Sequence, residues 1–210
     1  MASRARALSS LALMVLMLLP LPGWIFPGAG LTAQALREAV LWVLTAVLVV
    51  YVLQVERRPL ASIGLKKPTW KTWTFGVVGG LVMVAAMATI YLVVFPALGV
   101  SSTESAMQAV MATPFWLRLI VVVRAAVFEE LLFRGFMIER LAEITGSRAL
   151  AAILAAVVFT LAHLSFWGWI HIPIAACGAL VLTLLYLWRR DLVCNMTAHF
   201  VTDGIGFLLG

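Results

Sequence analysis

Two adjacent glutamates, Glu129 and Glu130, lie in a stretch of sequence that is otherwise apolar enough to cross a membrane. A charged side chain at the centre of a bilayer costs about 2.5–3.5 kcal/mol on insertion scales, so it must face a protein interior and be paired or used. His163, His199 and Asp203 occur in two other apolar segments. These residues predict a polar cluster buried in a lipid-embedded bundle, where the chemistry of the chain would be found.

The composition indicates a membrane protein. The chain has 210 residues, of which 64% are hydrophobic and 11% are charged, whereas a soluble domain has about 25% charged residues. The net charge of +6 comes from basic residues in short loops between apolar segments. This is the pattern of membrane orientation, and it does not indicate a nucleic-acid partner.

We expect an all-α polytopic bundle of about seven transmembrane helices, because a span needs about 20 apolar residues. Residues 1–210 form a single membrane domain in this interpretation, with a basic cytoplasmic loop at 56–72 and the motif-bearing helices at 115–209. The predicted segments are 8–28, 38–55, 74–96, 115–138, 149–165, 169–188 and 192–209.

Basic residues predict the orientation. With the N-terminus in the cytoplasm, eleven Lys and Arg residues lie inside, and only Arg37 and Arg118 lie outside, which is a positive-inside bias. The C-terminus would then lie outside, in a bacterial plasma membrane. The loop 56–72 could contact anionic lipid or serve only as an orientation signal. The first apolar segment is similar to a signal peptide, but it is long enough that we favour a retained span.

Helical spacing separates the two glutamates. Glu130 and Arg134 are four residues apart, so they share a face and can form an ion pair. Glu129 points to another face, where its charge is less directly compensated, and an uncompensated buried carboxylate suits a general base. A packing network of these three side chains is the alternative. Arg124 could be a further partner or a lipid-facing residue whose guanidinium reaches the interface.

The last segment carries a polar stripe. Asn195, His199 and Asp203 follow one another at intervals of four residues, so all three face the interior or water. With about 1.5 Å rise per residue, Glu129, His163 and this stripe all fall near the middle of the bilayer. One carboxylate and two imidazoles at one depth could activate water for amide hydrolysis or bind a metal such as zinc.

Other mechanisms find little support in the sequence. It contains no His-Glu-x-x-His motif and no Gly-x-Ser-x-Gly motif. Cys177 and Cys194 have no metal-ligand spacing and are expected to be reduced packing residues. His171 is expected to be an interfacial residue, separate from the cluster.

The ordered motifs resemble a known family. Glu129-Glu130-x-x-x-Arg134, then Phe159-x-x-x-His163, then His199-x-x-x-Asp203 are similar to the CPBP family of CAAX-processing and bacteriocin-processing intramembrane proteases, also called the Abi family. The preceding loop, Arg58-Pro59-Leu60-x-x-Ile63-Gly64-Leu65, is also similar to the family's pattern.

The resemblance implies a membrane endopeptidase that acts on hydrophobic, lipid-modified or membrane-anchored peptides. It implies that Glu129 and His163 activate water and that His199 and Asp203 stabilise the oxyanion. Glu130 and Arg134, together with Asn195 from the stripe, would orient the site. Family members are named both as metalloproteases and as glutamate-dependent proteases, so zinc on Glu129, His163 and His199 is one option.

One position departs from the usual pattern, because Asp203 stands where the family often has asparagine. An ionised Asp203 would repel an oxyanion, so it must be protonated, orient His199 or bind a metal. Two other functions are considered, a non-enzymatic scaffold or bacteriocin-immunity protein that keeps the fold, and a transporter or proton relay. The sequence lacks the inverted repeats that many transporters have.

Overall fold

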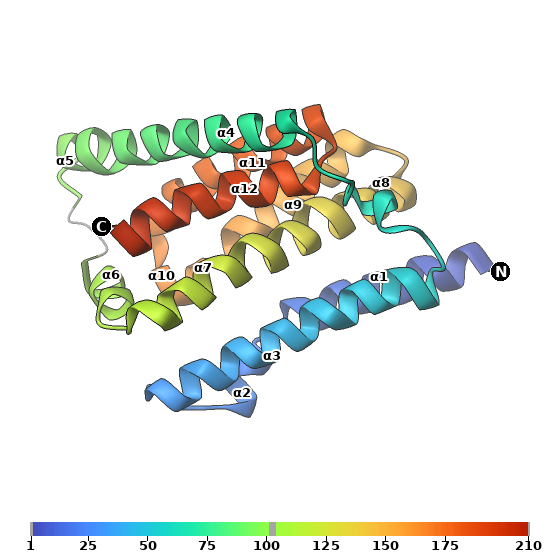
Figure 1. Ribbon diagram of the computed structural model, residues 1–210, viewed down its shortest axis with the longest axis horizontal. Coiled ribbons are helices and arrows are strands. Elements are labelled where there is room, and N and C mark those ends of the chain that lie inside the picture. The colour runs from blue at the N-terminus through green and yellow to red at the C-terminus, as the bar shows by residue number, and fades with distance from the viewer. Residues whose placement is uncertain (1, 101–103, 210) are drawn as a thin grey trace.

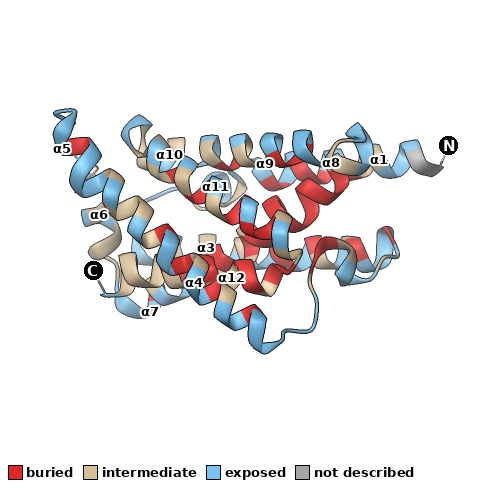
Figure 2. Cartoon of the chain, turned by 90° about the horizontal axis from the view of Figure 1, so that it is seen from above, coloured by how far each residue is buried: buried red, intermediate tan, exposed pale blue. Residues whose placement is uncertain are grey.

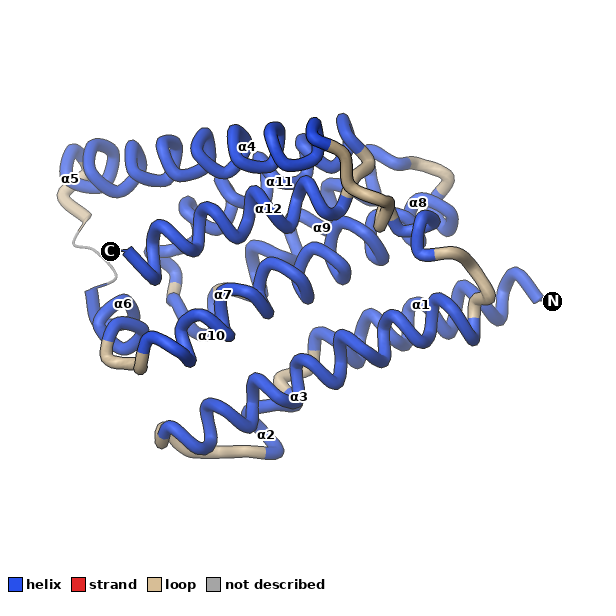
Figure 3. The backbone as a smooth tube through the Cα atoms, in the orientation of Figure 1, coloured by secondary structure: helices blue, strands red, loops and turns tan. Residues whose placement is uncertain are grey.

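The chain is a bundle of helices, as the composition predicts. The computed structural model describes residues 2–100 and 104–209, and this described part contains helices and loops but no strand (Figure 3). The first half comprises α1 (Ala2–Leu18), α2 (Leu21–Ile25), α3 (Leu31–Val50) with the π-helical extension η1 (Tyr51–Val55), the short 3-10 turn η2 (Leu60–Ile63), α4 (Trp70–Thr89), the π-helical η3 (Ile90–Val94), α5 (Phe95–Ala97) and α6 (Glu104–Met111). The second half comprises α7 (Phe115–Glu129), the π-helical η4 (Glu130–Met137), α8 (Ile138–Thr145), α9 (Arg148–Ala162), α10 (Leu164–Trp167), the 3-10 turn η5 (Trp169–His171), α11 (Ile172–Arg189), α12 (Leu192–Gly204) and the π-helical η6 (Ile205–Leu209).

Five helices in the described residues are long and apolar enough to cross a membrane, so the chain is a multi-pass membrane protein. They are Leu31–Val55, Trp70–Ala97, Arg148–Trp167, Trp169–Arg189 and Leu192–Leu209. Five of the predicted segments agree with them closely. The prediction of seven spans is not confirmed.

The other two predicted segments differ from these five for separate reasons. The helix that begins at Phe115 runs on to Thr145 through η4, and its several charged residues distinguish it from the five apolar spans. The segment predicted at 8–28 is divided, because α1 ends at Leu18 and Pro20 precedes α2. Proline lacks the N–H that would continue the helix.

Local sequence explains several of the helix ends. The Ser147 hydroxyl accepts a hydrogen bond from the backbone N–H of Leu150, and the Asp191 carboxylate accepts one from that of Cys194. These N-caps begin α9 and α12, respectively. Gly146 ends α8 in the left-handed conformation, with φ of 71°, which glycine adopts without steric cost.

The helix α12 lies inside the bundle and packs against α4, α7 and α11 (Figure 1). Buried residues follow the inward sides of the helices, and the outward sides are largely exposed (Figure 2). The pair α1 and α3 lies to one side of the bundle and reaches it through contacts between α3 and α7 (Figure 1). Because α7 and α12 carry most of the polar cluster, their packing positions the site.

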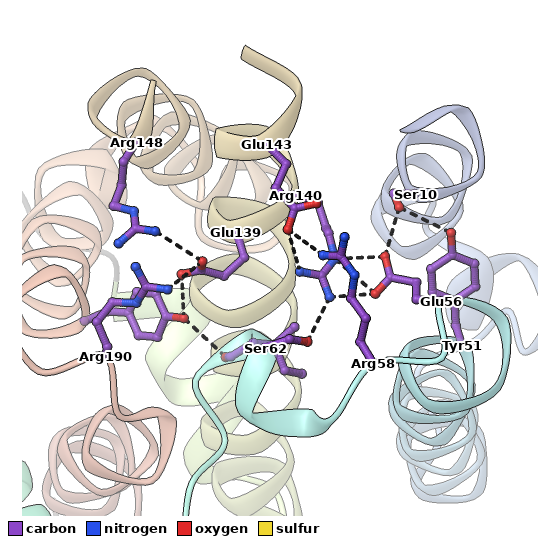
Figure 4. Close-up of polar contacts among 12 residues, drawn as sticks. Ser10, Tyr51, Glu56, Arg58, Ser62, Glu139, Arg140, Glu143, Arg148 and Arg190 are labelled. Atoms are coloured by element: carbon purple, nitrogen blue, oxygen red, sulfur yellow. Dashed lines mark hydrogen bonds and ion pairs between the residues drawn. The ribbon is translucent and has the colours of Figure 1, made fainter. Parts of the chain in front are cut away.

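The N- and C-termini lie at opposite ends of the long axis (Figure 1). Near the N-terminal end, Arg140 donates to both oxygens of Glu56 at 2.6–3.0 Å, and Arg190 donates to Glu139 at 2.7 Å (Figure 4). The bonds to Glu56 fasten the start of the basic loop to α8, and the bond from Arg190 fastens the end of α11 to α8. The orientation of this end toward the cytoplasm stays a prediction.

Candidate active site

The two adjacent glutamates lie at a change in helix type. Glu129 is the last residue of α7, and Glu130 is the first residue of the π-helical segment η4. All eight residues of η4 are buried. Such π-helical segments are rare and occur frequently at functional sites. The regular α-helical spacing expected from the sequence does not continue here, and no sequence signal indicated the wider turn.

Glu130 is the centre of a fully buried hydrogen-bond network. Its carboxylate accepts hydrogen bonds from Arg134 Nη1 at 2.7 Å, from Asn195 Nδ2 at 3.2 Å and from His199 Nδ1 at 2.9 Å. The expected pair with Arg134 is therefore present. The bonds to α12 are not local, so spacing could not indicate them. With three donors around it, Glu130 is suited to orient its neighbours.

Both ring nitrogens of His199 face carboxylates. Nδ1 lies 2.9 Å from Glu130 Oε1, and Nε2 lies 3.4 Å from Asp203 Oδ2. Because ionised carboxylates only accept hydrogen bonds, this arrangement suits a ring that carries a proton on each nitrogen. Of the three roles considered for Asp203, the contact favours orientation of His199.

Glu129 differs from Glu130 because, within the described residues, only one of its two carboxylate oxygens accepts a hydrogen bond. Oε1 accepts a hydrogen bond from Arg124 Nη1 at 3.2 Å, whereas Oε2 is buried and has no hydrogen-bond partner among the described residues. Arg124 is held in turn by Glu38 of α3. Arg124 is thus a partner of Glu129, which excludes the lipid-facing alternative.

His163 follows the last residue of α9. Its Nδ1 lies 2.8 Å from the carbonyl oxygen of Phe159. Since a carbonyl only accepts, the proton of a neutral ring lies on Nδ1, and Nε2 is left as an acceptor. The Phe159 ring contacts the imidazole at a centroid distance of 4.5 Å. These contacts fix the orientation of the imidazole.

A cavity of about 1010 Å³ brings these side chains together. Its polar lining includes all four residues predicted to be catalytic, together with two that join them through hydrogen bonds. They are Glu129, His163, His199, Asp203, Glu38 and Arg124. Most of the remaining wall is apolar, with side chains such as Met83, Met87 and Phe128. The network residues Glu130, Arg134 and Asn195 lie behind this wall.

Sequence reasoning missed two residues of the cavity. His171, which was expected to be separate from the cluster, lies on the cavity wall and stacks on Trp167 at a centroid distance of 4.6 Å. Glu38 was not considered. Its signal was weak, because a single carboxylate at the start of an apolar segment usually marks the membrane interface.

The donor set does not fit a zinc ion in this arrangement. Among the residues that the structure describes, no three His, Cys, Asp or Glu side chains gather closely enough to hold a metal. The two nitrogens of His199 both face carboxylates, and Glu129 pairs with Arg124. Zinc requires such groups as free ligands, so no step below involves a metal.

The fold and the site define a multi-pass helical membrane protein with an ionisable cluster on an apolar cavity. Residues 111–205 match the family model described as "Type II CAAX prenyl endopeptidase Rce1-like". The family resemblance is therefore confirmed, and this motif-bearing region belongs to the family of CAAX-processing membrane proteases. The match supports a CAAX-type intramembrane protease at the level of the family. No curated protein and no solved structure matches the chain.

Proposed function

We propose that the chain is an intramembrane endopeptidase that hydrolyses a peptide bond in hydrophobic, lipid-modified or membrane-anchored peptides. The proposal rests above all on Glu129, whose buried Oε2 has no hydrogen-bond partner and whose side chain lines the same apolar cavity as His163 and His199. A buried, unsatisfied acceptor costs about 1–3 kcal/mol. That cost is offset when a water molecule or a substrate group occupies the site.

In the first step, Glu129 and His163 activate a water molecule. Both residues line the cavity, and Glu129 Oε2 and His163 Nε2 would accept the hydrogen bonds of this water. As the water oxygen attacks the carbonyl carbon, its proton moves to Glu129, and the carbonyl oxygen becomes an oxyanion. A general base of this kind contributes roughly 10²–10⁴-fold to the rate.

In the second step, the Nε2–H group of His199, whose contact with Asp203 Oδ2 is long at 3.4 Å, donates to the oxyanion, while Nδ1–H stays on Glu130. Glu130 fixes the imidazole from Nδ1, and Asp203 orients it from the Nε2 side. A preorganised donor at this position contributes about 2.7–4 kcal/mol in well-studied hydrolases. Collapse of the intermediate breaks the C–N bond, and the leaving amine takes the proton from Glu129.

The cavity supports the proposed class of substrate. Its walls are predominantly apolar, and the helices around it are long enough to lie in lipid. A peptide that already partitions into the membrane would therefore meet the site. We propose the bacterial plasma membrane as the location, with the N-terminus in the cytoplasm and the C-terminus outside.

The test is peptide hydrolysis by purified protein in liposomes, with quenched fluorescent membrane peptides that carry or lack a prenyl group. Wild type would be compared with Glu129→Gln and His163→Asn. Glu143→Gln is the matched control, because Glu143 is half exposed and pairs with Arg58 far from the cavity. We expect both site variants to lose at least roughly 100-fold in rate and the control to keep its activity.

The same experiment addresses the scaffold alternative. A non-enzymatic protein would give no cleavage in any variant, although all of them fold. Equal cleavage by wild type and Glu129→Gln would contradict the assignment of Glu129 as the base.

A further inference from the structure

Glu38 and Arg124 form a second polar layer beside Glu129 that the mechanism above does not use. Arg124 Nε lies 2.8 Å from Glu38 Oε2, and Arg124 Nη2 lies 3.3 Å from Glu38 Oε1. The remaining amino group, Nη1, lies 3.2 Å from Glu129 Oε1. The side chains are only 12%, 12% and 17% exposed for Arg124, Glu38 and Glu129, respectively, so these charges are poorly screened by solvent.

The rigid geometry of the Arg124 guanidinium determines where its third nitrogen points. A guanidinium is planar, and its five N–H donors form a rigid fork. When Glu38 binds the edge formed by Nε and Nη2, the plane of the guanidinium is fixed, and Nη1 can only point one way. That direction leads to Glu129. A lysine could supply the charge but could not transmit the orientation.

We propose that Glu38 and Arg124 are positioning residues for Glu129. Glu38 fixes the guanidinium of Arg124, and Arg124 holds Oε1 of Glu129, so that Oε2 stays directed at the water. This inference rests on the proposed function of Glu129 as the base. Neither residue contacts the reacting atoms, so both act through the orientation of one carboxylate.

The proposal gives the first part of the chain a role in the site. Glu38 belongs to α3, which lies outside the residues that match the family model. Together with α1, α3 lies to one side of the bundle (Figure 1). The link joins residues 86 positions apart. The position of α3 would therefore determine how well Glu129 is aligned, and the side pair of helices would contribute directly to catalysis.

The test is a double-mutant cycle measured as kcat and KM in liposomes. Glu38→Gln and Arg124→Gln should each lower kcat by roughly 10–100-fold, since small misplacements of a catalytic group cost about this much. KM should stay within about twofold, because substrate binding is unchanged. The double variant should be no slower than Arg124→Gln alone, because Glu38 acts only through Arg124.

Two further variants sharpen the test. Arg124→Lys keeps the charge but loses the fork, so its kcat should stay near that of Arg124→Gln. Arg58→Gln is the matched control, since Arg58 also forms an ion pair between the segment after α3 and α8, at an exposed position. Its kcat should equal that of the wild type.

The outcomes separate this inference from the proposed function. Full activity of Glu129→Gln would overturn the proposed function itself. Loss of activity in Glu129→Gln with normal kcat in Glu38→Gln would overturn only the positioning role. Recovery of wild-type kcat by Arg124→Lys would also overturn the positioning role. So would a double variant whose loss equals the sum of the two single losses and whose unfolding temperature falls in parallel, because that result indicates general destabilisation.

Discussion

Replacement of Gly80 by alanine should separate two helices that position the site. The helix α4 approaches α12 closely at Gly76 and Gly80. A Cβ atom on Gly80 would lie 2.7 Å from the backbone oxygen of Ala198 and 2.7 Å from Cβ of Val201. Ordinary contacts begin at 3.4 Å, so the helices must part locally by 3.4 − 2.7 = 0.7 Å. Neither contacted atom can rotate away, because one is backbone and the other is a Cβ atom.

The expected cost follows from this overlap. Overpacking in a well-packed interior costs about 1–3 kcal/mol, and small residues at helix contacts are what allow close approach in membranes. Ala198 precedes His199, so the displacement acts next to the imidazole. The bond between His199 and Glu130 is 2.9 Å long and would be weakened by such a shift. We expect kcat to fall by roughly 10–100-fold.

The assays are thermal unfolding and peptide hydrolysis of the Gly80→Ala protein in lipid. Gly79→Ala is the matched control, because its Cβ would meet the end of the flexible Leu185 side chain at 3.1 Å. That contact can relax, so stability and activity should stay close to wild type. Wild-type behaviour of Gly80→Ala, or equal damage in both variants, would refute the reasoning that this contact positions α12.

Two further predictions concern other parts of the structure. Tyr186→Phe should lower the free energy of unfolding by about 1.5–3 kcal/mol, because the hydroxyl donates to buried Glu139 at 2.9 Å. Thermal unfolding in lipid would measure this loss, and an unchanged unfolding midpoint would contradict the prediction. Treatment with a zinc chelator should leave peptide hydrolysis unchanged, because His199 is held between two carboxylates. Loss of activity that added zinc restores would show that the side chains rearrange around a metal.

The sequence was sufficient to predict the features that depend on local spacing. Long apolar runs predicted the helical membrane fold and five of the observed spans closely. The interval of four residues placed Glu130 beside Arg134, and the structure has this pair. The same interval placed Asn195 and His199 on one inward stripe, and both are buried. The catalytic roles of the cluster stay predictions, because they depend on chemistry that a fold alone does not test.

The features that sequence could not provide depend on long-range contacts. The ion pair between Glu38 and Arg124 joins α3 to α7, and nothing in the spacing of either helix indicates it. The position of His171 depends on how the turn η5 folds back against the cavity. The π-helical turns also have no clear pattern of residue types, so an α-helical period is the only reasonable expectation from sequence.

The adjacent carboxylates show why this arrangement can combine stability with reactivity. Two negative charges side by side in an apolar bundle repel each other, and each needs compensation. The structure gives each a separate arginine, Arg124 for Glu129 and Arg134 for Glu130. The difference lies in the remaining donors. Glu130 has two more, from α12, and is fully satisfied, whereas Glu129, which lines the cavity, has one buried oxygen without a partner among the described residues. Adjacent residues of a helix point to different faces, so the two glutamates reach different surroundings, one suited to hold the site and the other to accept a proton.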